Sequence, residues 1–468
     1  MNVLLVYPSH GRFEIAPSVQ MSIGAFIPPL GLLYLAKMIE LEGHHVKVID
    51  CSAEEHPMEA IRQSLNDMDV VGTTVYSGPR DNAFSLQISH LIKEHDPDLP
   101  LVLGGPHCSL FPQQTLEKHH ADVIVQGEAE GRIVPILNAL QDHQLFSTIP
   151  GITYRNNDQI HINPPSEHQQ NLDALPFPSR HLVKHYSYGY SFGVKVVPGV
   201  VTSMMSSRGC PFRCRFCQQS VFTPKFQSHS VPRIIQEIDD LVQNGYTSIV
   251  FADDDFLWNK KQTEKIMDHI IKENYDLTLW IANARVDSAD KTLYTKLQKA
   301  GVEHIIFGIE SGNQEMLNFY NKKITLDQIR KAVALSHEMG FFTSGNFIIG
   351  GPIETKQHIQ ETIDFARSLR LDNAFFKELM YAAKSPLWNE AVQQGKINPD
   401  ESMVMADHHR DLGLFTPKEL QEFCDKAFLT FTMNPRYWLR ELGFVLRHRN
   451  FRFLHLGLRL LLKKHNSV

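Results

Sequence analysis

Three cysteines within eight positions have the most specific spacing for chemistry in this sequence. Cys210, Cys214 and Cys217 follow the pattern CxxxCxxC in the run RGCPFRCRFC. Thiolates at such spacing bind zinc or an iron–sulfur cluster. A structural zinc needs a fourth ligand, and no CxxC or HxxxH partner follows at the usual distance. A 4Fe–4S cluster on three cysteines keeps one iron open for an exogenous ligand, so the spacing favours iron–sulfur, with zinc as the alternative.

The cysteine motif follows the first strand of a repeated strand–helix pattern. Strands are expected at 200–206, 248–253, 277–284, 304–309, 343–349 and 374–381, and segments of helical period separate them. Six such units predict a partial (βα)6 barrel over residues 199–385. Parallel barrels bind their ligands at the carboxyl ends of the strands, which is where the three cysteines are expected.

Residues 1–145 show a separate alternation of strands and helices. Strands are expected at 2–8, 45–51, 69–77, 100–106 and 122–128, which predicts a doubly wound, Rossmann-like parallel sheet and an α/β protein. Ligands of such sheets bind at the carboxyl edge. Three of these strand ends carry small and polar residues, which predict a ligand cleft, with simple strand termination as the alternative: Thr73, Thr74, Tyr76, Ser77, Gly104, Gly105, Pro106, His107, Gly127 and Glu128.

Two further regions complete the expected organisation. Residues 146–198 are predicted as an ordered linker with a hairpin, in which 152–154 pairs with 159–162. Residues 386–468 are predicted as a helical C-terminal region. Within it, the segment 436–464 carries eight Lys or Arg residues and one acid, Glu441, interleaved with apolar residues. Such a helix either rests on an anionic membrane surface or packs on the barrel with a solvated face.

The composition excludes several classes of protein. Hydrophobic residues make up 43% and charged residues 21% of the 468 residues, which excludes global disorder. The net charge of −6 argues against holding nucleic acid by bulk charge. The sequence shows no transmembrane stretch and no signal-peptide pattern, so a cytoplasmic protein is expected. Six cysteines are too few for a disulfide scaffold.

The cysteine motif and the strand ends that follow it resemble the radical S-adenosylmethionine (SAM) superfamily. The motifs are FADDDF at 251–256, ARVD at 284–287, GIESG at 308–312 and GGPIET at 350–355. The acidic run departs from the commoner Gly-Gly-Glu form. The resemblance implies that Cys210, Cys214 and Cys217 hold a 4Fe–4S cluster. It also implies SAM contacts by five residues: Phe216 near the adenine, Asp254 at the amino group, Arg285 at the carboxylate, and Glu310 with Ser311 as polar contacts.

The N-terminal sheet resembles the cobalamin-binding domain that precedes many radical SAM barrels. The resemblance is carried by the runs PPLGL at 28–32, GGPH at 104–107 and GEAE at 127–130. It implies that the dimethylbenzimidazole tail of base-off cobalamin lies in the cleft edged by residues 73–77 and 104–107. The Asp-x-His-x-x-Gly signature is missing, because Pro8 and Phe13 flank His10. Many members of the resembled family also lack that histidine.

Together these resemblances imply a cobalamin-dependent radical SAM enzyme of the methylase or anaerobic-cyclase branch. A methylase would form a 5′-deoxyadenosyl radical and use methylcobalamin to methylate an unactivated carbon. The basic, apolar tail suggests a hydrophobic, lipid-like substrate and a peripheral contact with the inner face of a membrane. An external one-electron donor of flavodoxin or ferredoxin type is also implied.

Three alternatives remain open at this point. An enzyme similar to anaerobic magnesium-protoporphyrin monomethyl ester cyclase would use both cofactors without methylating its substrate. A cobalamin-responsive binding protein with a structural cluster would catalyse nothing. A structural zinc protein would contain one zinc per chain and no iron.

Overall fold

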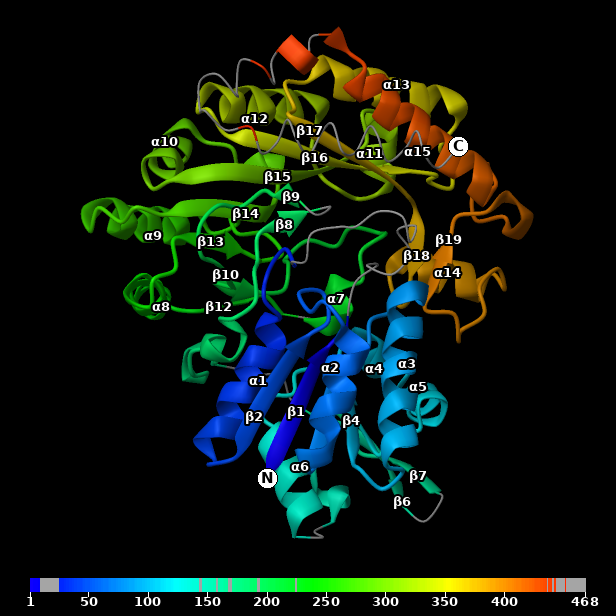
Figure 1. The fold of residues 1–468 in the computed structure, drawn as a ribbon. Coiled ribbons are helices and arrows are strands. Elements are labelled where there is room, and N and C mark those ends of the chain that lie inside the picture. Colours follow the sequence, from blue (N-terminus) through cyan, green and yellow to red (C-terminus); the bar gives the residue numbers. More distant parts are fainter. Residues whose placement is uncertain are drawn as a thin grey trace. The chain divides into compact units, whose positions relative to one another are not determined.

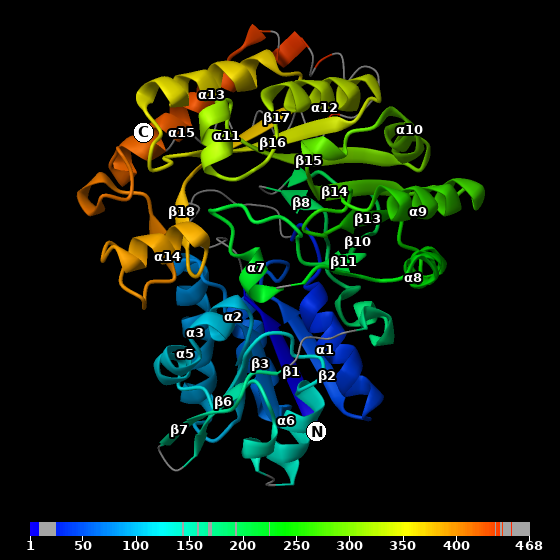
Figure 2. The same ribbon diagram turned by 180° about the vertical axis from the view of Figure 1, so that it is seen from behind.

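The computed structural model describes residues 1–8, 25–142, 145–156, 159–166, 171–191, 194–223, 225–435, 437–439, 442 and 451. The chain divides into two compact units, Met1–Gly193 and Val194–Val468. Each unit is an α/β structure built on a parallel sheet, as Figures 1 and 2 show from opposite sides. The predicted α/β class is therefore confirmed.

The first unit contains a seven-stranded sheet with the order β2-β1-β3-β4-β5-β6-β7. Its five parallel strands are β1 (Asn2–Tyr7), β2 (His45–Asp50), β3 (Val70–Thr74), β4 (Leu101–Gly104) and β5 (Val123–Val125). The strand order reverses between β1 and β3, which confirms the doubly wound, Rossmann-like prediction. The expected hairpin is formed by β6 (Ile152–Asn156) and β7 (Gln159–Ile162). Because β6 pairs antiparallel with β5, the hairpin extends this sheet.

Helices cover both faces of this sheet, which explains why its strands are continuous apolar runs. Leu4 and Val6 of β1 belong to a core that includes residues of α2, α3 and α5, whereas α1 contacts β1, β2 and α6. The helices are α1 (Leu30–Leu41), α2 (Pro57–Ser64), α3 (Pro79–His95), α4 (Pro106–Leu110), α5 (Pro112–His119) and α6 (Ile133–Gln141). Short 3₁₀ helices are η2 (Leu65–Asp67), η3 (Phe146–Thr148), η4 (Leu172–Ala174) and η5 (Arg180–Val183).

The second unit contains a six-stranded parallel sheet with the order β10-β13-β14-β15-β16-β17. This order, strictly sequential, is the partial (βα)6 barrel that the sequence predicts. Its strands are β10 (Val201–Met204), β13 (Ser248–Phe251), β14 (Thr278–Ala284), β15 (Val302–Glu310), β16 (Phe342–Ile349) and β17 (Asn373–Glu378). Short strands elsewhere are β8 (Tyr190–Ser191), β9 (Val194–Lys195), β11 (Ser207–Arg208), β12 (Gln227–Ser228), β18 (Met380–Ala382) and β19 (Met403–Met405).

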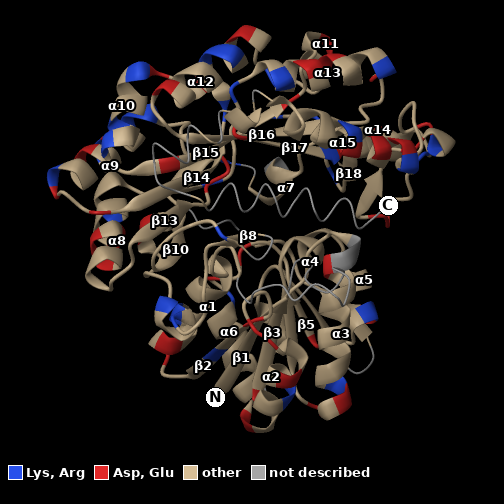
Figure 3. Ribbon diagram, turned by 45° about the horizontal axis from the view of Figure 1, so that its top comes forward, with Lys and Arg blue, Asp and Glu red and all other residues tan. Residues whose placement is uncertain are grey.

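Most helices of the second unit pack on the outer face of its sheet, whereas the short helix α7 lies apart from this layer. A single core joins strand residues such as Ile249, Leu279 and Phe307 to the helices outside them. Lys, Arg, Asp and Glu are interspersed on the outer helices α9, α10 and α12 (Figure 3). The helices are α7 (Gln219–Phe222), α8 (Val231–Gln243), α9 (Lys260–Lys272), α10 (Lys291–Lys299), α11 (Gln314–Phe319), α12 (Leu326–Glu338) and α13 (Lys356–Ser368), with η6 (Val286–Ser288).

The C-terminal region is mainly helical, as expected, and contains α14 (Pro386–Gln393), η7 (His408–Arg410) and α15 (Pro417–Thr432). It also contains β19, which pairs antiparallel with β18. Three residues are too few to show a strand pattern in the sequence, so this strand could not be recognised there. Helix α15 packs against β17 and α13, as the helix of a sixth barrel unit would. Most of the basic segment 436–464 lies outside the described residues.

Candidate cofactor sites

The three cysteines lie in one loop between β11 and α7 of the second unit. Cys214 is 9% exposed, and burial raises the pKa of all three thiols, that of Cys217 to about 11. The charges of the other two thiols raise the pKa of Cys217 further. In the described part of the chain, no three His, Cys, Asp or Glu side chains form a metal-binding group. Three soft thiolates in one loop are nevertheless the donor set that an iron–sulfur cluster requires.

The acidic run after β13 anchors the entrance of this loop. Asp253 is fully buried and accepts hydrogen bonds from the backbone of Ser206 (3.1 Å) and from the hydroxyls of Ser206 and Ser207 (both 2.6 Å). Burial raises the pKa of Asp253, and these donors oppose the shift. The end of β13 therefore fixes the chain directly before the first cysteine.

Asp254 joins the two ends of the cysteine loop. Its carboxylate accepts a hydrogen bond from the backbone N–H of Gly209 (3.1 Å), just before Cys210, and one from the side chain of Gln219 (2.9 Å), just after Cys217. The backbone N–H of Gln219 in turn donates to the Cys217 sulfur (3.4 Å). Burial raises the pKa of Asp254 to about 6. Asp254 thus contacts the cluster loop itself, and its expected SAM contact stays a prediction.

Arg285 is held in place by three sets of contacts. Its guanidinium forms two hydrogen bonds with Asp287 (3.1 and 2.9 Å) and donates to the backbone oxygen of Lys322 (2.8 Å). It also lies 3.5 Å from the ring centroid of Phe212, a residue of the cysteine loop. Asp255, next to it, has a pKa raised by burial to about 6. Arg285 therefore lies beside the cysteine loop and is paired with Asp287, and its expected contact with the SAM carboxylate stays a prediction.

Glu310 forms a buried ion pair that the sequence did not reveal. Its carboxylate lies 2.7 Å from the Lys322 ammonium, and the two side chains are 9% and 8% exposed. Burial raises the pKa of the Cys214 thiol, and the positive charge of Lys322 is the strongest influence that opposes it. Glu310, Lys322, Arg285 and Cys214 therefore form one cluster of charged groups.

The remaining SAM candidates differ in their surroundings. The Phe216 ring packs edge-on against Tyr320, with 5.4 Å between centroids. Ser311 is fully buried and bonded to the Thr362 hydroxyl (3.1 Å), so it connects β15 to α13. In the turn after β16, Glu354 accepts hydrogen bonds from the backbone N–H groups of Gly350 and Gly351 (2.6 and 3.0 Å). This turn is therefore fixed from inside by its own glutamate.

In the first unit, the expected cobalamin residues meet at one edge of the sheet. Thr74 and Gly104 are direct neighbours across β3 and β4. Just beyond, the N–H of Val75 donates to the Gly104 oxygen (2.8 Å), and the N–H of His107 donates to the Val75 oxygen (3.0 Å). The Thr73 hydroxyl instead donates to Val6 (2.9 Å) and supports the sheet. The carboxyl ends of β3 and β4 are thus locked together.

Gly105 and His107 have the features of a ligand cradle. Gly105 has φ = 98°, and a Cβ there would lie 2.6 Å from the Thr74 methyl carbon and 3.0 Å from the Val75 oxygen. Pro106 begins α4 directly after it. Burial lowers the pKa of His107 to about 4, and its buried Nδ1 has no hydrogen-bond partner among the described residues. Close backbone approach and an unsatisfied imidazole nitrogen fit a bulky polar cofactor such as cobalamin.

Ser109, which the sequence analysis did not single out, bonds the loop after β5 to the loop after β4. Ser109 donates its hydroxyl hydrogen to the Gly105 oxygen (3.0 Å) and accepts from the N–H of Gly127 (2.8 Å). Gly127 has φ = 77°, a conformation that ends β5, and Glu128 follows it. At the ends of β3 and β1, the Tyr76 hydroxyl donates to that of Tyr7 (3.2 Å). Ser77 lies buried one residue further along.

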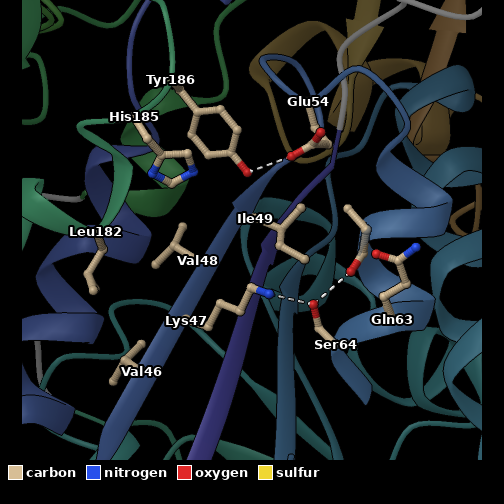
Figure 4. Close-up of a pocket in the computed structure, with 11 residues that line it drawn as sticks. Val46, Lys47, Val48, Ile49, Glu54, Gln63, Ser64, Leu182, His185 and Tyr186 are labelled. Carbon is tan, nitrogen blue, oxygen red and sulfur yellow. Dashed lines mark hydrogen bonds between the residues drawn. The ribbon is translucent and has the colours of Figure 1, made fainter. Parts of the chain in front are cut away.

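A cavity of about 320 Å³ lies elsewhere in the first unit (Figure 4). It opens on the edge strand β2 and is lined by residues of β2, the loop after it, α2, η5 and the segment after η5. Two hydrogen bonds cross it, from Lys47 to Ser64 (2.8 Å) and from Tyr186 to Glu54 (3.0 Å). None of the expected cobalamin residues lines it.

Sequence reasoning missed Lys322, Tyr320, Gln219 and Ser109. Each lies outside the strand-end motifs, and its contacts form only in the folded chain: Lys322 with Glu310, Tyr320 with Phe216, Gln219 with Asp254, and Ser109 with Gly127. The only sequence signal for Lys322 is its place shortly after the GIESG motif. His10 lies outside the described residues. No described helix is long and apolar enough to span a membrane.

Comparisons with known proteins agree with this arrangement. Residues 204–366 match the radical SAM superfamily, and residues 19–137 match the B12 binding domain. The chain is 31% identical to an uncharacterised methyltransferase of Pyrococcus horikoshii, over 96% of both chains. It is 28% identical to the anaerobic magnesium-protoporphyrin IX monomethyl ester cyclase of Rubrivivax gelatinosus, over 80% of this chain and 67% of the cyclase.

A solved structure shares the fold. The radical SAM methyltransferase TsrM from Kitasatospora setae, with tryptophan and a SAM analogue bound, has a TM-score of 0.68 at 17% identity. The match covers 93% of this chain and 84% of TsrM. The two family matches and the full-length relative confirm the resemblance to cobalamin-binding radical SAM proteins. The cofactors of this chain are accordingly a 4Fe–4S cluster, SAM and cobalamin. The chain belongs to the B12-binding radical SAM enzymes.

Proposed function

We propose that this radical SAM enzyme is a methyltransferase that methylates a carbon of an apolar substrate. The observation that carries the proposal is the 31% identity to a methyltransferase over 96% of both chains. When bound, the cluster supplies the electron that cleaves SAM, and cobalamin carries the methyl group. Cys210, Cys214 and Cys217 would hold the cluster. As in all radical SAM enzymes, an external reductant is needed.

The inner face of the second sheet supports an apolar substrate. Side chains alternate along a strand, so Ile306 faces away from the outer core that contains Ile305 and Phe307. Ile348 and Phe375 share this inner face and, like Ile306, are only half-buried. Lys377 is exposed and pairs with Ile348 across β16 and β17. An apolar substrate with an anionic group would suit these residues.

Mass spectrometry with labelled SAM tests the reaction type. The reconstituted enzyme, supplied with hydroxocobalamin, reductant and SAM labelled in its methyl group, is incubated anaerobically with a lipid extract and with a water-soluble extract of cells. The proposal expects a lipid-fraction product that gains the labelled methyl. A product changed without the label would contradict the proposal and favour a cyclase-like reaction, as in the relative from Rubrivivax gelatinosus.

We also propose that the segment 436–464 holds the enzyme at an anionic membrane surface. Its eight cations against one acid, interleaved with Leu and Phe, support this. The full chain is expected to float with anionic vesicles and not with zwitterionic ones, whereas a chain ending at residue 435 should stay at the bottom of the gradient. Equal behaviour of both chains with anionic vesicles would refute membrane attachment through this segment.

A further inference from the structure

We propose that the ammonium of Lys322, which its ion pair with Glu310 holds in a buried position, raises the reduction potential of the cluster bound at Cys214. Lys322 would then act on the cluster through its positive charge, without touching the substrate. This inference goes beyond methyl transfer and does not depend on what the substrate is.

The backbone holds Lys322 beside the cysteine loop. The N–H of Arg215 donates to the Tyr320 oxygen (3.0 Å), and the Asn321 side chain donates to the Arg213 oxygen (2.8 Å). These bonds join residues 320 and 321 to the residues on either side of Cys214. The distance between Lys322 and Cys214 is therefore fixed by main-chain contacts as well as by side chains.

The burial of this lysine with its partner requires several unfavourable or restrictive local features. The Lys322 ammonium and the Glu310 carboxylate are 2.7 Å apart and more than nine-tenths buried. Glu310 has φ = 68°, a left-handed conformation that disfavours side chains. Gly308 leaves the space they occupy, because a Cβ there would lie 2.7 Å from the Glu310 oxygen and 2.9 Å from the Lys322 nitrogen. Since a buried ion pair seldom adds net stability, its placement here points to a role in the site.

Two cations lie beside the cysteine loop, and each is paired with an acid. Arg285 forms two hydrogen bonds with Asp287 and donates to the backbone oxygen of Lys322, and Lys322 is paired with Glu310. Reduction adds a negative charge to the cluster, and a nearby buried cation stabilises that charge more than it would in water.

Redox titration of the reconstituted holoenzyme, followed by electron paramagnetic resonance without SAM, tests the proposal. Lys322→Met is expected to shift the midpoint potential to a more negative value, and Lys322→Arg to restore most of it. Glu310→Gln removes the opposing negative charge and is expected to shift the potential in the positive direction. The matched control is Lys323→Met, which removes an exposed charge from the adjacent position.

The two opposite shifts distinguish a charge effect from damage to the loop. All variants are compared at equal iron and sulfide per chain. If Lys322→Met lost its cluster, the positive shift of Glu310→Gln would still support the proposal, and its absence would overturn it. Potentials of Lys322→Met and Lys323→Met that both equal the wild-type value would overturn it as well. A failure of methyl transfer would leave these potentials unaffected, so the two proposals can fail separately.

Discussion

The side-chain amide of Gln219 donates a hydrogen bond to the carboxylate of Asp254 at 2.9 Å. The same carboxylate oxygen accepts a hydrogen bond from the backbone N–H of Gly209. This one oxygen of Asp254 therefore joins the two ends of the cysteine loop. Loss of a residue that orients metal ligands in this way lowers the metal affinity by about 10- to 100-fold.

Asp254→Ala is therefore expected to weaken cluster retention by about 10- to 100-fold. The measurement is the rate at which a chelator removes iron from the reconstituted protein under anaerobic conditions. Asp268→Ala is the matched control, because Asp268 is an exposed carboxylate that pairs with Lys296 on the outer helices. Equal rates for both variants would show that the Asp254 contacts do not hold the loop.

Each of the substitutions Cys210→Ala, Cys214→Ala and Cys217→Ala is expected to abolish binding of a complete 4Fe–4S cluster, because each removes one of three protein ligands. Cys424→Ala, at a buried position on α15, should retain four irons per chain. Iron and sulfide analysis with visible spectra measures this. One zinc per chain in the anaerobically purified wild type, without iron, would instead support the structural-zinc alternative.

Glu354 is expected to make the stability of the second unit depend on pH. Burial raises its folded-state pKa from 4.5 to about 7. The folded state thus holds this proton more tightly, so the contribution of Glu354 to stability is fully present below pH 4.5 and falls by about 3 kcal/mol as pH rises to 7, at about 1.4 kcal/mol per pKa unit.

Glu354→Gln removes this titration and should flatten the dependence between those pH values. Urea unfolding of both proteins at pH 5 and pH 7.5 measures the difference. The fall in stability should be larger in the wild type, and an equal fall in both proteins would contradict the assignment.

Gly105→Ala is expected to weaken cobalamin binding. The added Cβ would meet the Thr74 methyl carbon at 2.6 Å and would be strained at φ = 98°. A left-handed conformation costs a side chain roughly 1–2 kcal/mol, and the clash pushes the ends of β3 and β4 apart. Titration with hydroxocobalamin, followed by its visible spectrum, measures the affinity. Gly131→Ala is the control, since a Cβ there meets nothing within 4 Å. Unchanged binding in Gly105→Ala would place the cofactor elsewhere.

Much of this protein can be deduced from local sequence. The period of apolar residues predicted both parallel sheets, because neighbouring side chains alone decide whether a segment suits a strand or a helix. The spacing of the three cysteines identified the cluster loop for the same reason, since its ligands lie within eight positions.

Only the tertiary structure decided which residues support that loop. Lys322 follows α11, more than a hundred positions after Cys214, and Asp253 and Asp254 contact residues 47 and 45 positions before them. The pairing of the hairpin with β5 could not be predicted from the sequence either, because strand pairing depends on the order of strands in the sheet. Ion pairs and hydrogen bonds between distant segments carry no periodic signal, since either partner alone looks like an ordinary surface residue. Burial and proximity arise only when the strands and helices pack, and the charges around the cluster follow from that packing.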